Sequence, residues 1–241
     1  MILVGIHPVA EALRAGRPIE RVLIAKGAGG PRLQEIIDLA RQSSTPLRFE
    51  LRAALDRLGG SAAHQGVVAL GAAQKYRGLD DVRDGARMLV FLDGVEDPHN
   101  LGAVIRTAHA AGVDAVVIPE RRAAGLTETV AKAAAGALEH LPIVRVGNLN
   151  RALDELKKSR FTIYGVDERG TEDYDRTPYA SPAAIVLGGE GKGLHEMVRK
   201  RCDVVVRIPM AGKISSLNVS VAAGIVLFDW KRRAASTPTA S

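Results

Sequence analysis

Six short apolar runs separated by helical segments constrain the fold of this 241-residue chain most strongly. The run over residues 88–92 reads Met-Leu-Val-Phe-Leu, with no polar residue. A strand that is apolar throughout needs cover on both faces, as in the parallel sheets of α/β proteins. The expected strands cover residues 88–92, 115–118, 143–146, 161–166, 184–187 and 204–208, and the expected helices 101–111, 149–158, 194–201 and 217–230. The sequence therefore predicts an α/β domain built on a parallel sheet.

A smaller α/β unit precedes this domain. Its apolar patterns predict helices over residues 8–15 and 31–41 and strands over residues 22–25, 47–51 and 66–70. The following segment is polar without a persistent apolar face, which is typical of a linker. The last eight residues lack apolar side chains to bury, which favours a disordered tail. We therefore expect a first domain over residues 1–72, a linker over 73–87, a second domain over 88–233 and a disordered tail over 234–241.

Composition excludes several classes of protein. The single cysteine, Cys202, cannot form an internal disulfide or a multi-cysteine zinc site. The N-terminal residues lack the features of a signal peptide, and no stretch reaches the ~18 apolar residues of a membrane helix. We therefore expect a cytoplasmic protein without a membrane partner. The net charge of +6 is compatible with a polyanionic partner.

The first of three segments with candidate functional residues covers residues 93–106. It follows the end of an expected strand, where α/β sheets place their ligand sites. Asn100 is a suitable helix N-cap. Arg106, two turns into the helix, is either a surface arginine or one that faces a phosphate or a developing oxyanion. The acidic and histidine side chains between 93 and 99 match no metal-binding spacing, so we expect no metal.

The second segment, residues 187–194, runs from a strand through four glycines into a helix. Glycines at this place let the backbone approach a ligand closely. The spacing fits neither a P-loop nor a dinucleotide fingerprint. Glu190 is the only acid of the loop, and it is either a solvated turn residue or a functional group.

The third segment leads from residue 207, at the end of another strand, into the last long helix. Ser215 or Ser216 can cap that helix. Capping does not explain Asn218 and Ser220, which are poor helix formers in the expected first turn. Three polar segments at strand ends favour one shared site at that edge of the sheet.

In this order, the three segments resemble the three signature motifs of the SpoU/TrmH family of RNA ribose 2′-O-methyltransferases, a part of the SPOUT class. The resemblance spans residues 88–230, and its run Ser216-Leu217-Asn218-Val219-Ser220 is highly specific. Residues 5–13 and 64–67 are similar to the substrate-binding domain of one subgroup, the 23S ribosomal RNA guanosine-2′-O-methyltransferases.

The resemblance implies a fold, a cofactor and partners. The fold is a parallel-sheet domain with a deep trefoil knot, preceded by a small RNA-binding domain that resembles a ribosomal protein. The partners are large-subunit ribosomal RNA and a second copy of the chain in a homodimer. The cofactor is S-adenosylmethionine, and the residues implied to hold it are Leu187, Gly188, Gly189, Ile208, Met210 and Leu217.

The resemblance also implies the polar residues of the active site: Asn100, Arg106, Glu190, Ser216 and Asn218. The family's usual candidate for the base corresponds to Arg106, but a guanidinium stays protonated in proteins. We therefore expect Arg106 to hold the target phosphate and to stabilise the developing alkoxide. Glu190 either accepts the proton, directly or through water, or braces the glycine loop.

Three alternatives stay open on the sequence. The substrate is a transfer RNA, the enzyme is an antibiotic-resistance methyltransferase for ribosomal RNA, or the chain is a non-catalytic RNA-binding assembly factor. The small N-terminal domain argues against the transfer RNA subgroup, which typically lacks it. The intact Arg106, Glu190 and Asn218 argue against a loss of catalysis.

Overall fold

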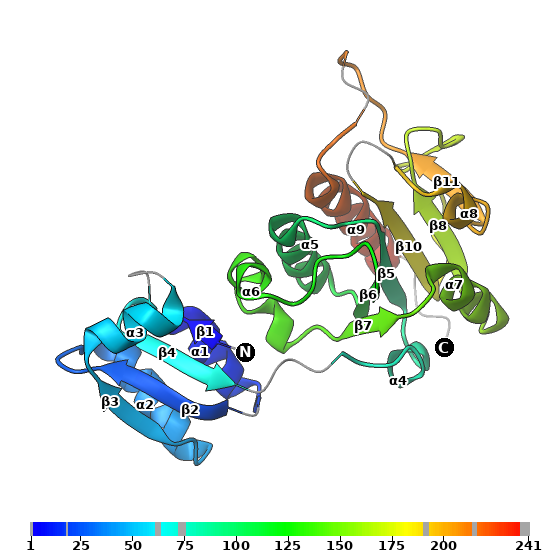
Figure 1. Cartoon of the computed structure of the whole chain (residues 1–241). Helices are drawn as coiled ribbons and strands as arrows, with labels where there is room; N and C mark the ends of the chain where they lie inside the picture. Colours follow the sequence, from blue (N-terminus) through cyan, green and yellow to red (C-terminus); the bar gives the residue numbers. More distant parts are fainter. Residues whose placement is uncertain are drawn as a thin grey trace. The chain divides into compact units, whose positions relative to one another are not determined.

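The computed structural model of the chain describes residues 2–17, 19–60, 64–71, 76–189, 193–213 and 216–236. The chain divides into two compact units, each with its own sheet (Figure 1). The first unit contains Met1–Lys75 and Leu126–His140, and the second contains Tyr76–Gly125 and Leu141–Ser241.

The first unit is a four-stranded sheet with helices on both faces. Its main elements are β1 (Ile2–Val4), α1 (Ile6–Arg14), β2 (Ile19–Ala25), α2 (Pro31–Gln42), β3 (Leu47–Glu50), α3 (Arg52–Gly59) and β4 (Val67–Gly71). The strand order is β1-β4-β2-β3, with β4 antiparallel to β1 and β2, and β3 parallel to β2. Val22 and Ile24 pack with α1 and α2, whereas Leu23 packs with Leu55 of α3. Successive strand residues point to opposite faces, so this apolar strand needs helices on both.

A later segment of the chain also groups with the first unit. It contains α6 (Glu128–Ala134) and a 3₁₀ turn (Ala137–Glu139). Contacts with the N-terminal residues explain the grouping, because α6 contacts β1 and His140 Nε2 lies 2.8 Å from a carboxylate oxygen of Glu11. This segment was expected in the second domain, and no local pattern in the sequence signals its contacts with the N-terminal residues.

The second unit is built on a parallel sheet of seven strands. They are β5 (Met88–Asp93), β6 (Ala115–Pro119), β7 (Ile143–Val146), β8 (Thr162–Val166), β9 (Glu172–Asp173), β10 (Ala183–Gly188) and β11 (Val204–Arg207). Their order is β7-β6-β5-β10-β8-β11-β9, and all neighbours run parallel. All six residues of β5 are buried. The predicted α/β fold with a parallel sheet is confirmed.

Helices cover both faces of this sheet (Figure 1). On one face, α7 (Leu149–Lys158) and α8 (Glu196–Arg199) contribute to a core with alternate residues of β5 and β10. On the other face, α5 (Pro98–Ala111) and α9 (Val219–Ser236) pack against each other. The carboxyl ends of the parallel strands therefore share one edge, which is where the three candidate segments begin.

Some expected boundaries change in the structure. The polar segment expected as a linker contains α4 (Asp80–Arg83), and Leu79 is buried in the core of the second unit. Helix α9 continues to Ser236, so the first residues of the expected tail are helical. Residues 237–241 lie outside the described residues.

The helix expected over residues 194–201 shortens to α8. Its first two expected N–H groups are taken by carboxylates from other strands: Leu194 N donates to Asp167, and His195 N donates to Asp93. These bonds hold the backbone in a turn ahead of the helix. Two aspartates distant in sequence set this boundary, so local helical periodicity did not reveal it.

Candidate functional site

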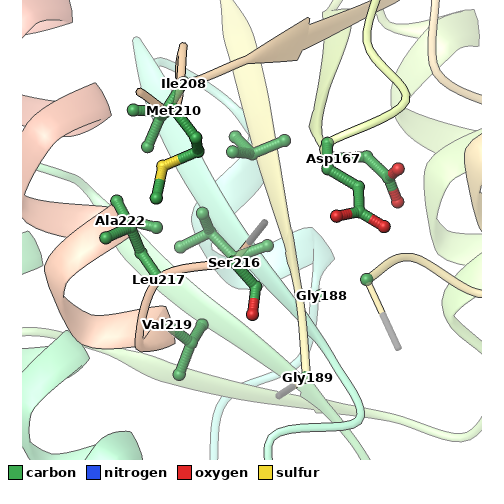
Figure 2. Close-up of a pocket in the computed structure, with 13 residues that line it drawn as sticks. Asp167, Gly188, Gly189, Ile208, Met210, Ser216, Leu217, Val219 and Ala222 are labelled. Atoms are coloured by element: carbon green, nitrogen blue, oxygen red, sulfur yellow. The ribbon is translucent and has the colours of Figure 1, made fainter. Parts of the chain in front are cut away.

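A cavity that we call the sheet-end pocket opens where β8, β10 and β11 end (Figure 2). Its lining residues are Val166, Asp167, Glu168, Leu187, Gly188, Gly189, Gly193, Ile208, Met210, Ser216, Leu217, Val219 and Ala222. The second and third candidate segments therefore meet in one pocket, at the edge of the sheet where a ligand site was expected.

The six residues that the resemblance implied for the cofactor all line the sheet-end pocket, and so does Ser216. Val166, Asp167 and Glu168, at the end of β8, were not among the site residues expected from the sequence. One signal was available, because Val166 ends the apolar run over residues 161–166 and the two acids follow it directly. The carboxyl end of that strand lies at the same edge as the three recognised segments.

Gly188 and Gly189 are required by the close approach of other backbone segments. A Cβ atom on Gly188 would lie 2.2 Å from the carbonyl carbon of Gly193, and one on Gly189 would lie 2.2 Å from the carbonyl oxygen of Gly94. Gly189 and Gly193 also form a β-bridge. These glycines were expected to let the backbone approach a ligand closely, and the structure shows that they also admit the neighbouring chain, which shapes the pocket wall.

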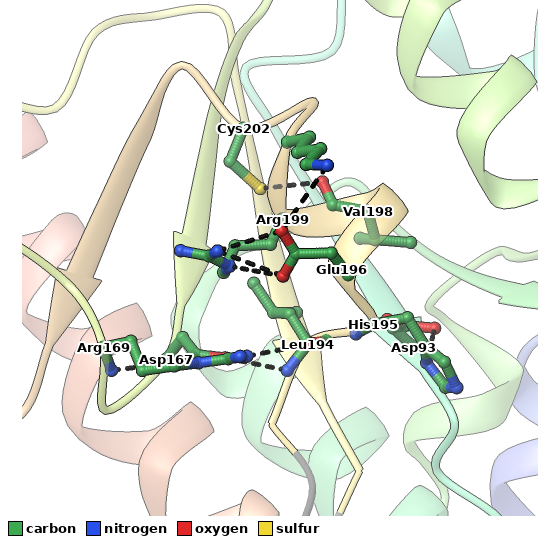
Figure 3. Close-up of polar contacts among 10 residues, drawn as sticks. Asp93, Asp167, Arg169, Leu194, His195, Glu196, Val198, Arg199 and Cys202 are labelled. Atoms are coloured by element: carbon green, nitrogen blue, oxygen red, sulfur yellow. Dashed lines mark hydrogen bonds and ion pairs between the residues drawn. The ribbon is translucent and has the colours of Figure 1, made fainter.

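Asp167 ties the end of β8 to the glycine loop (Figure 3). Its side chain is fully buried, at 0% exposure. One oxygen accepts hydrogen bonds from the backbone N and Nε of Arg169, and the other accepts from Arg169 Nη2 and from Leu194 N, at 2.7–3.0 Å. Burial raises the pKa of this carboxyl, but the hydrogen bonds outweigh burial and lower the pKa to about 2. Asp167 is therefore a charged anchor for the loop.

Asp167→Asn is expected to destabilise the protein in a pH-dependent manner. The pKa of the folded carboxyl, about 2, lies below its ordinary value of 3.8. A lowered folded pKa adds stability above the ordinary value, and that contribution is lost as the pH falls from about 4 towards 2. Urea unfolding at about pH 7 and 5 should give the variant a smaller free energy of unfolding than the wild type. At about pH 3, this difference between the two proteins should be smaller. A difference in unfolding free energy that does not change with pH would mean that the charge of Asp167 does not cause the destabilisation.

A hydrogen bond between Asn218 and Asn100 joins the third candidate segment to the first. Asn218 Nδ2 donates to Asn100 Oδ1 at 2.9 Å. Asn218 Oδ1 accepts from the backbone N of Ser220 at 2.9 Å, so Asn218 caps α9, which begins one residue later. The expected caps, Ser215 or Ser216, are thus corrected: Ser216 lines the sheet-end pocket, and Ser215 lies outside the described residues.

The N-cap of α5 also differs from the expectation. Asp97 caps this helix, since its side chain accepts from His99 N at 3.1 Å and the helix begins at Pro98. Proline suits a first helical position because it has no N–H group to satisfy there. Asn100 is therefore inside the helix, where it is 8% exposed and can bond to Asn218.

Two predicted polar residues are not brought into this arrangement. Arg106 lies on the exposed side of α5 and does not line the sheet-end pocket. Glu190 lies outside the described residues. The structure thus brings Asn100 and Asn218 into contact and places Ser216 in the pocket, while Arg106 is not among the residues that line the pocket.

The sheet-end pocket combines apolar walls with negative charge. Leu187, Ile208 and Leu217 offer surfaces that suit a flat aromatic group. Asp167 and Glu168 are the charged residues among its described lining. Because the buried carboxylate of Asp167 is paired with Arg169, Glu168 is the acid that favours a ligand with positive charge. S-adenosylmethionine carries an adenine ring, a sulfonium and an ammonium group, so the residues present fit this cofactor.

Among the described residues, no group of three or more His, Cys, Asp or Glu side chains is arranged to hold a metal ion. In the same part of the chain, no helix is both long enough and apolar enough to cross a bilayer.

Comparisons with known proteins agree with this geometry. Residues 87–228 match the model of the SpoU rRNA methylase family, and residues 2–77 match a model described as RNA 2′-O ribose methyltransferase substrate binding. A relative from Bacillus subtilis, named as a TrmH family tRNA/rRNA methyltransferase, is 40% identical over 237 residues, which cover 96% of this chain and 95% of the relative.

Solved structures extend the comparison to the cofactor. The SpoU methyltransferase AviRb from Streptomyces viridochromogenes, crystallised with AdoMet, is similar with a TM-score of 0.84 and 27% identity over 98% of this chain and 91% of its own. The TrmH/SpoU tRNA modifying enzyme of A. aeolicus is similar with a TM-score of 0.57 and 29% identity, over 68% of this chain and 88% of its own. The cofactor is S-adenosylmethionine. With a sheet-end pocket that fits this cofactor and a family match over more than half of its length, the chain belongs to the SpoU rRNA methylase family of RNA methyltransferases.

Proposed function

We propose that this protein transfers a methyl group from S-adenosylmethionine to the ribose 2′-hydroxyl of a guanosine in 23S ribosomal RNA. The observation that carries the proposal is the N-terminal unit, whose residues 2–77 match a substrate-binding model. The A. aeolicus tRNA modifying enzyme covers only 68% of this chain, whereas AviRb covers 98%. A domain beyond the methyltransferase domain favours a large folded RNA as the substrate. The guanosine is proposed from the resemblance of residues 5–13 and 64–67 to the 23S subgroup.

The cofactor's role is to supply a methyl group on a positively charged sulfur. In the proposal, Leu187, Ile208, Met210 and Leu217 pack around the adenine, and backbone groups at Gly188 and Gly189 contact the cofactor. Glu168 lies at the same pocket and its carboxylate would face the positive charges. This charge complementarity supports the assignment.

The chain's own residues must position and activate a weakly acidic sugar hydroxyl. Alignment of two reactants contributes roughly 7–11 kcal/mol, whereas a positioned base contributes typically 10²–10⁴-fold in rate. Positioning therefore outweighs proton removal. We assign positioning to Ser216 and to the pair formed by Asn100 and Asn218, whose hydrogen bond supports a fixed geometry beside the pocket. Arg106 would hold the phosphate and the developing alkoxide, and Glu190 is the proposed proton acceptor.

The proposal includes a homodimer and a trefoil knot in the second domain, over residues 88–233, of a cytoplasmic enzyme. Val221 and Phe228 on α9 are exposed at 49% and 47%. Exposed apolar side chains on one helix are typical of an interaction surface, which supports a second copy of the chain as the partner that covers them. The glycine loop and the segment before α9 line one pocket, which supports the proposed crossing of these two segments. The first domain, over residues 1–72, would bind the RNA.

Labelled S-adenosylmethionine and purified protein test the proposed function directly. Total ribosomal RNA and transfer RNA from cells that lack the enzyme serve as substrates, and the labelled nucleosides are identified by mass spectrometry. We expect 2′-O-methylguanosine in large-subunit RNA only. Label in transfer RNA would contradict the proposed substrate. It would favour a transfer RNA methyltransferase, an alternative that the name of the Bacillus relative includes. Bound cofactor without label in either RNA would favour the non-catalytic assembly factor.

A further inference from the structure

A second cavity, which we call the flanking groove, opens at the carboxyl ends of β5, β6 and β7. It has a volume of about 430 Å³, and its lining includes Arg121, Arg122, Asn150, His195 and Met197. None of these residues lines the sheet-end pocket, and none has a role in the proposed chemistry. The strand order β7-β6-β5-β10-β8 places the groove and the pocket at the same edge of the sheet.

A hollow between the two cavities connects them. It shares Gly189, Gly193 and Val219 with the sheet-end pocket, and Asp93, Gly94, Arg122 and His195 with the flanking groove. Neighbouring strands are about 4.8 Å apart, so β6, two strands from β10, lies roughly 10 Å away along the edge. An RNA strand with its methylated nucleotide beside the cofactor in the sheet-end pocket would therefore pass the flanking groove with a neighbouring nucleotide.

His195 is held in a defined orientation in the flanking groove (Figure 3). Asp93, which is 6% exposed, accepts from His195 N at 2.8 Å, and its other oxygen lies 2.9 Å from His195 Nδ1. If Nδ1 carries the proton towards this carboxylate, Nε2 is an acceptor. Arg122 Nη1 lies 3.1 Å from Nε2. The buried aspartate thus orients the imidazole, and the imidazole orients the guanidinium.

Two arginines give the flanking groove positive charge. Arg121 and Arg122 are both exposed, and neither forms an ion pair with a carboxylate in the described part of the chain. The two acids of the groove are engaged elsewhere, since Asp93 pairs with His195 and Glu196 pairs with Arg199. Arg122 also has a left-handed backbone, with φ at +59°, a conformation that is costly for a non-glycine residue. Guanidinium groups of this kind are suited to bind phosphate.

The groove also offers contacts for a nucleobase. The side-chain oxygen of Asn150 is buried and has no hydrogen-bond partner, although buried polar atoms are nearly always paired. The Asn150 side chain as a whole is partly exposed, so a rotation of its amide would present this oxygen to a base N–H group. Met197 is 54% exposed, and its thioether makes favourable contacts with aromatic rings.

We propose that the flanking groove binds a nucleotide close to the methylated one in the same RNA strand. Its phosphate is held by Arg121 and Arg122, and its base lies against Met197 with one edge at Asn150. This inference rests on the proposed RNA methyltransferase function and adds a second subsite to it. It makes Arg122 a determinant of RNA affinity and Asn150 a determinant of sequence preference.

Arg122→Ala tests the phosphate contact. With 23S ribosomal RNA transcribed in vitro, we expect the variant to raise the KM for RNA roughly tenfold, with kcat and the Kd for S-adenosylmethionine close to wild type. The slope of log affinity against log salt should fall by about 0.7–0.9, the loss of one phosphate contact. Lys158→Ala is the matched control, because it also removes one exposed positive charge but lies at the far end of α7, about 15 Å from the groove end.

Asn150→Ala tests the base contact. A transcript library randomised beside the methylated nucleotide is offered to both proteins, and the methylated products are sequenced. We expect a preference at one position with the wild type and its loss with the variant. An Arg122→Ala protein with the same KM and salt slope as Lys158→Ala, while the wild type is active, would overturn the subsite alone. A wild type that methylates no RNA would overturn the proposed function and the subsite together. The unchanged cofactor Kd shows that each variant is folded.

Discussion

Arg106→Ala is expected to lower the rate of methyl transfer by roughly 10²–10³-fold, the usual cost of removing a donor that stabilises a developing oxyanion. The Kd for S-adenosylmethionine should not change, because Arg106 does not line the sheet-end pocket. The folded state should also be unaffected, since substitutions at exposed positions usually change the free energy of unfolding by no more than about 0.5 kcal/mol. Single-turnover methyl transfer and calorimetric titration of the cofactor measure the two quantities separately.

Arg106→Lys is the informative companion variant. It keeps the positive charge but loses the planar fork that binds a phosphate through two parallel hydrogen bonds. If Arg106 acts by charge and position, this variant retains measurable activity at neutral pH. Activity that instead rises with pH along the titration of a lysine would contradict this role and identify the position as the base.

A subunit-mixing experiment asks where Arg106 acts. It is exposed on α5, outside the pocket of its own chain, so in the proposed homodimer it would serve the pocket of the other copy. Arg106→Ala and Ser216→Ala are each expected to be nearly inactive, but an equal mixture would form dimers with one intact site and recover about a quarter of wild-type activity. No recovery after subunit exchange would show that both residues must belong to the same chain.

The sequence predicted the parts of the fold that depend on local patterns. The run over residues 88–92 is apolar at every position, and it forms the fully buried centre of β5. The three polar segments follow β5, β10 and β11, as expected from strands that end at one edge of a parallel sheet. The resemblance to the SpoU/TrmH motifs then implied seven of the lining residues before the structure: Leu187, Gly188, Gly189, Ile208, Met210, Ser216 and Leu217.

Contacts between segments distant in sequence could not be predicted in this way. Asp167 and Asp93 follow ordinary strands, and nothing local shows that they hold the backbone of Leu194 and His195. No local pattern marks His195 as a functional residue either, because its partners come from β5 and from the loop after β6. The cap of α9 was also assigned to the wrong residue, since Asn218 bonds both to its own helix and to Asn100.

Gly188→Ala is expected to abolish cofactor binding and to destabilise the second unit. The new Cβ would lie 2.2 Å from Gly193 C, 2.3 Å from Gly193 O and 2.6 Å from Leu194 N. All three are backbone atoms, so no side-chain rotation relieves the clash and either β10 or the glycine loop must move. Overpacking of this kind costs about 1–3 kcal/mol, and we expect the upper end of that range. Urea unfolding and calorimetric titration of S-adenosylmethionine provide the measurements.

Gly147→Ala is the matched control in the same unit, because its Cβ would meet no atom closer than 3.9 Å and its φ is not left-handed. We expect it to keep both stability and cofactor affinity. The comparison also separates two reasons for the glycine at residue 188. If the glycine served only the approach of a ligand, alanine would weaken cofactor binding and leave the free energy of unfolding unchanged. Because the clash is with the chain itself, we expect both quantities to fall together, and a Gly188→Ala protein of wild-type stability would show that the glycine loop is not packed against β10 as the structure describes.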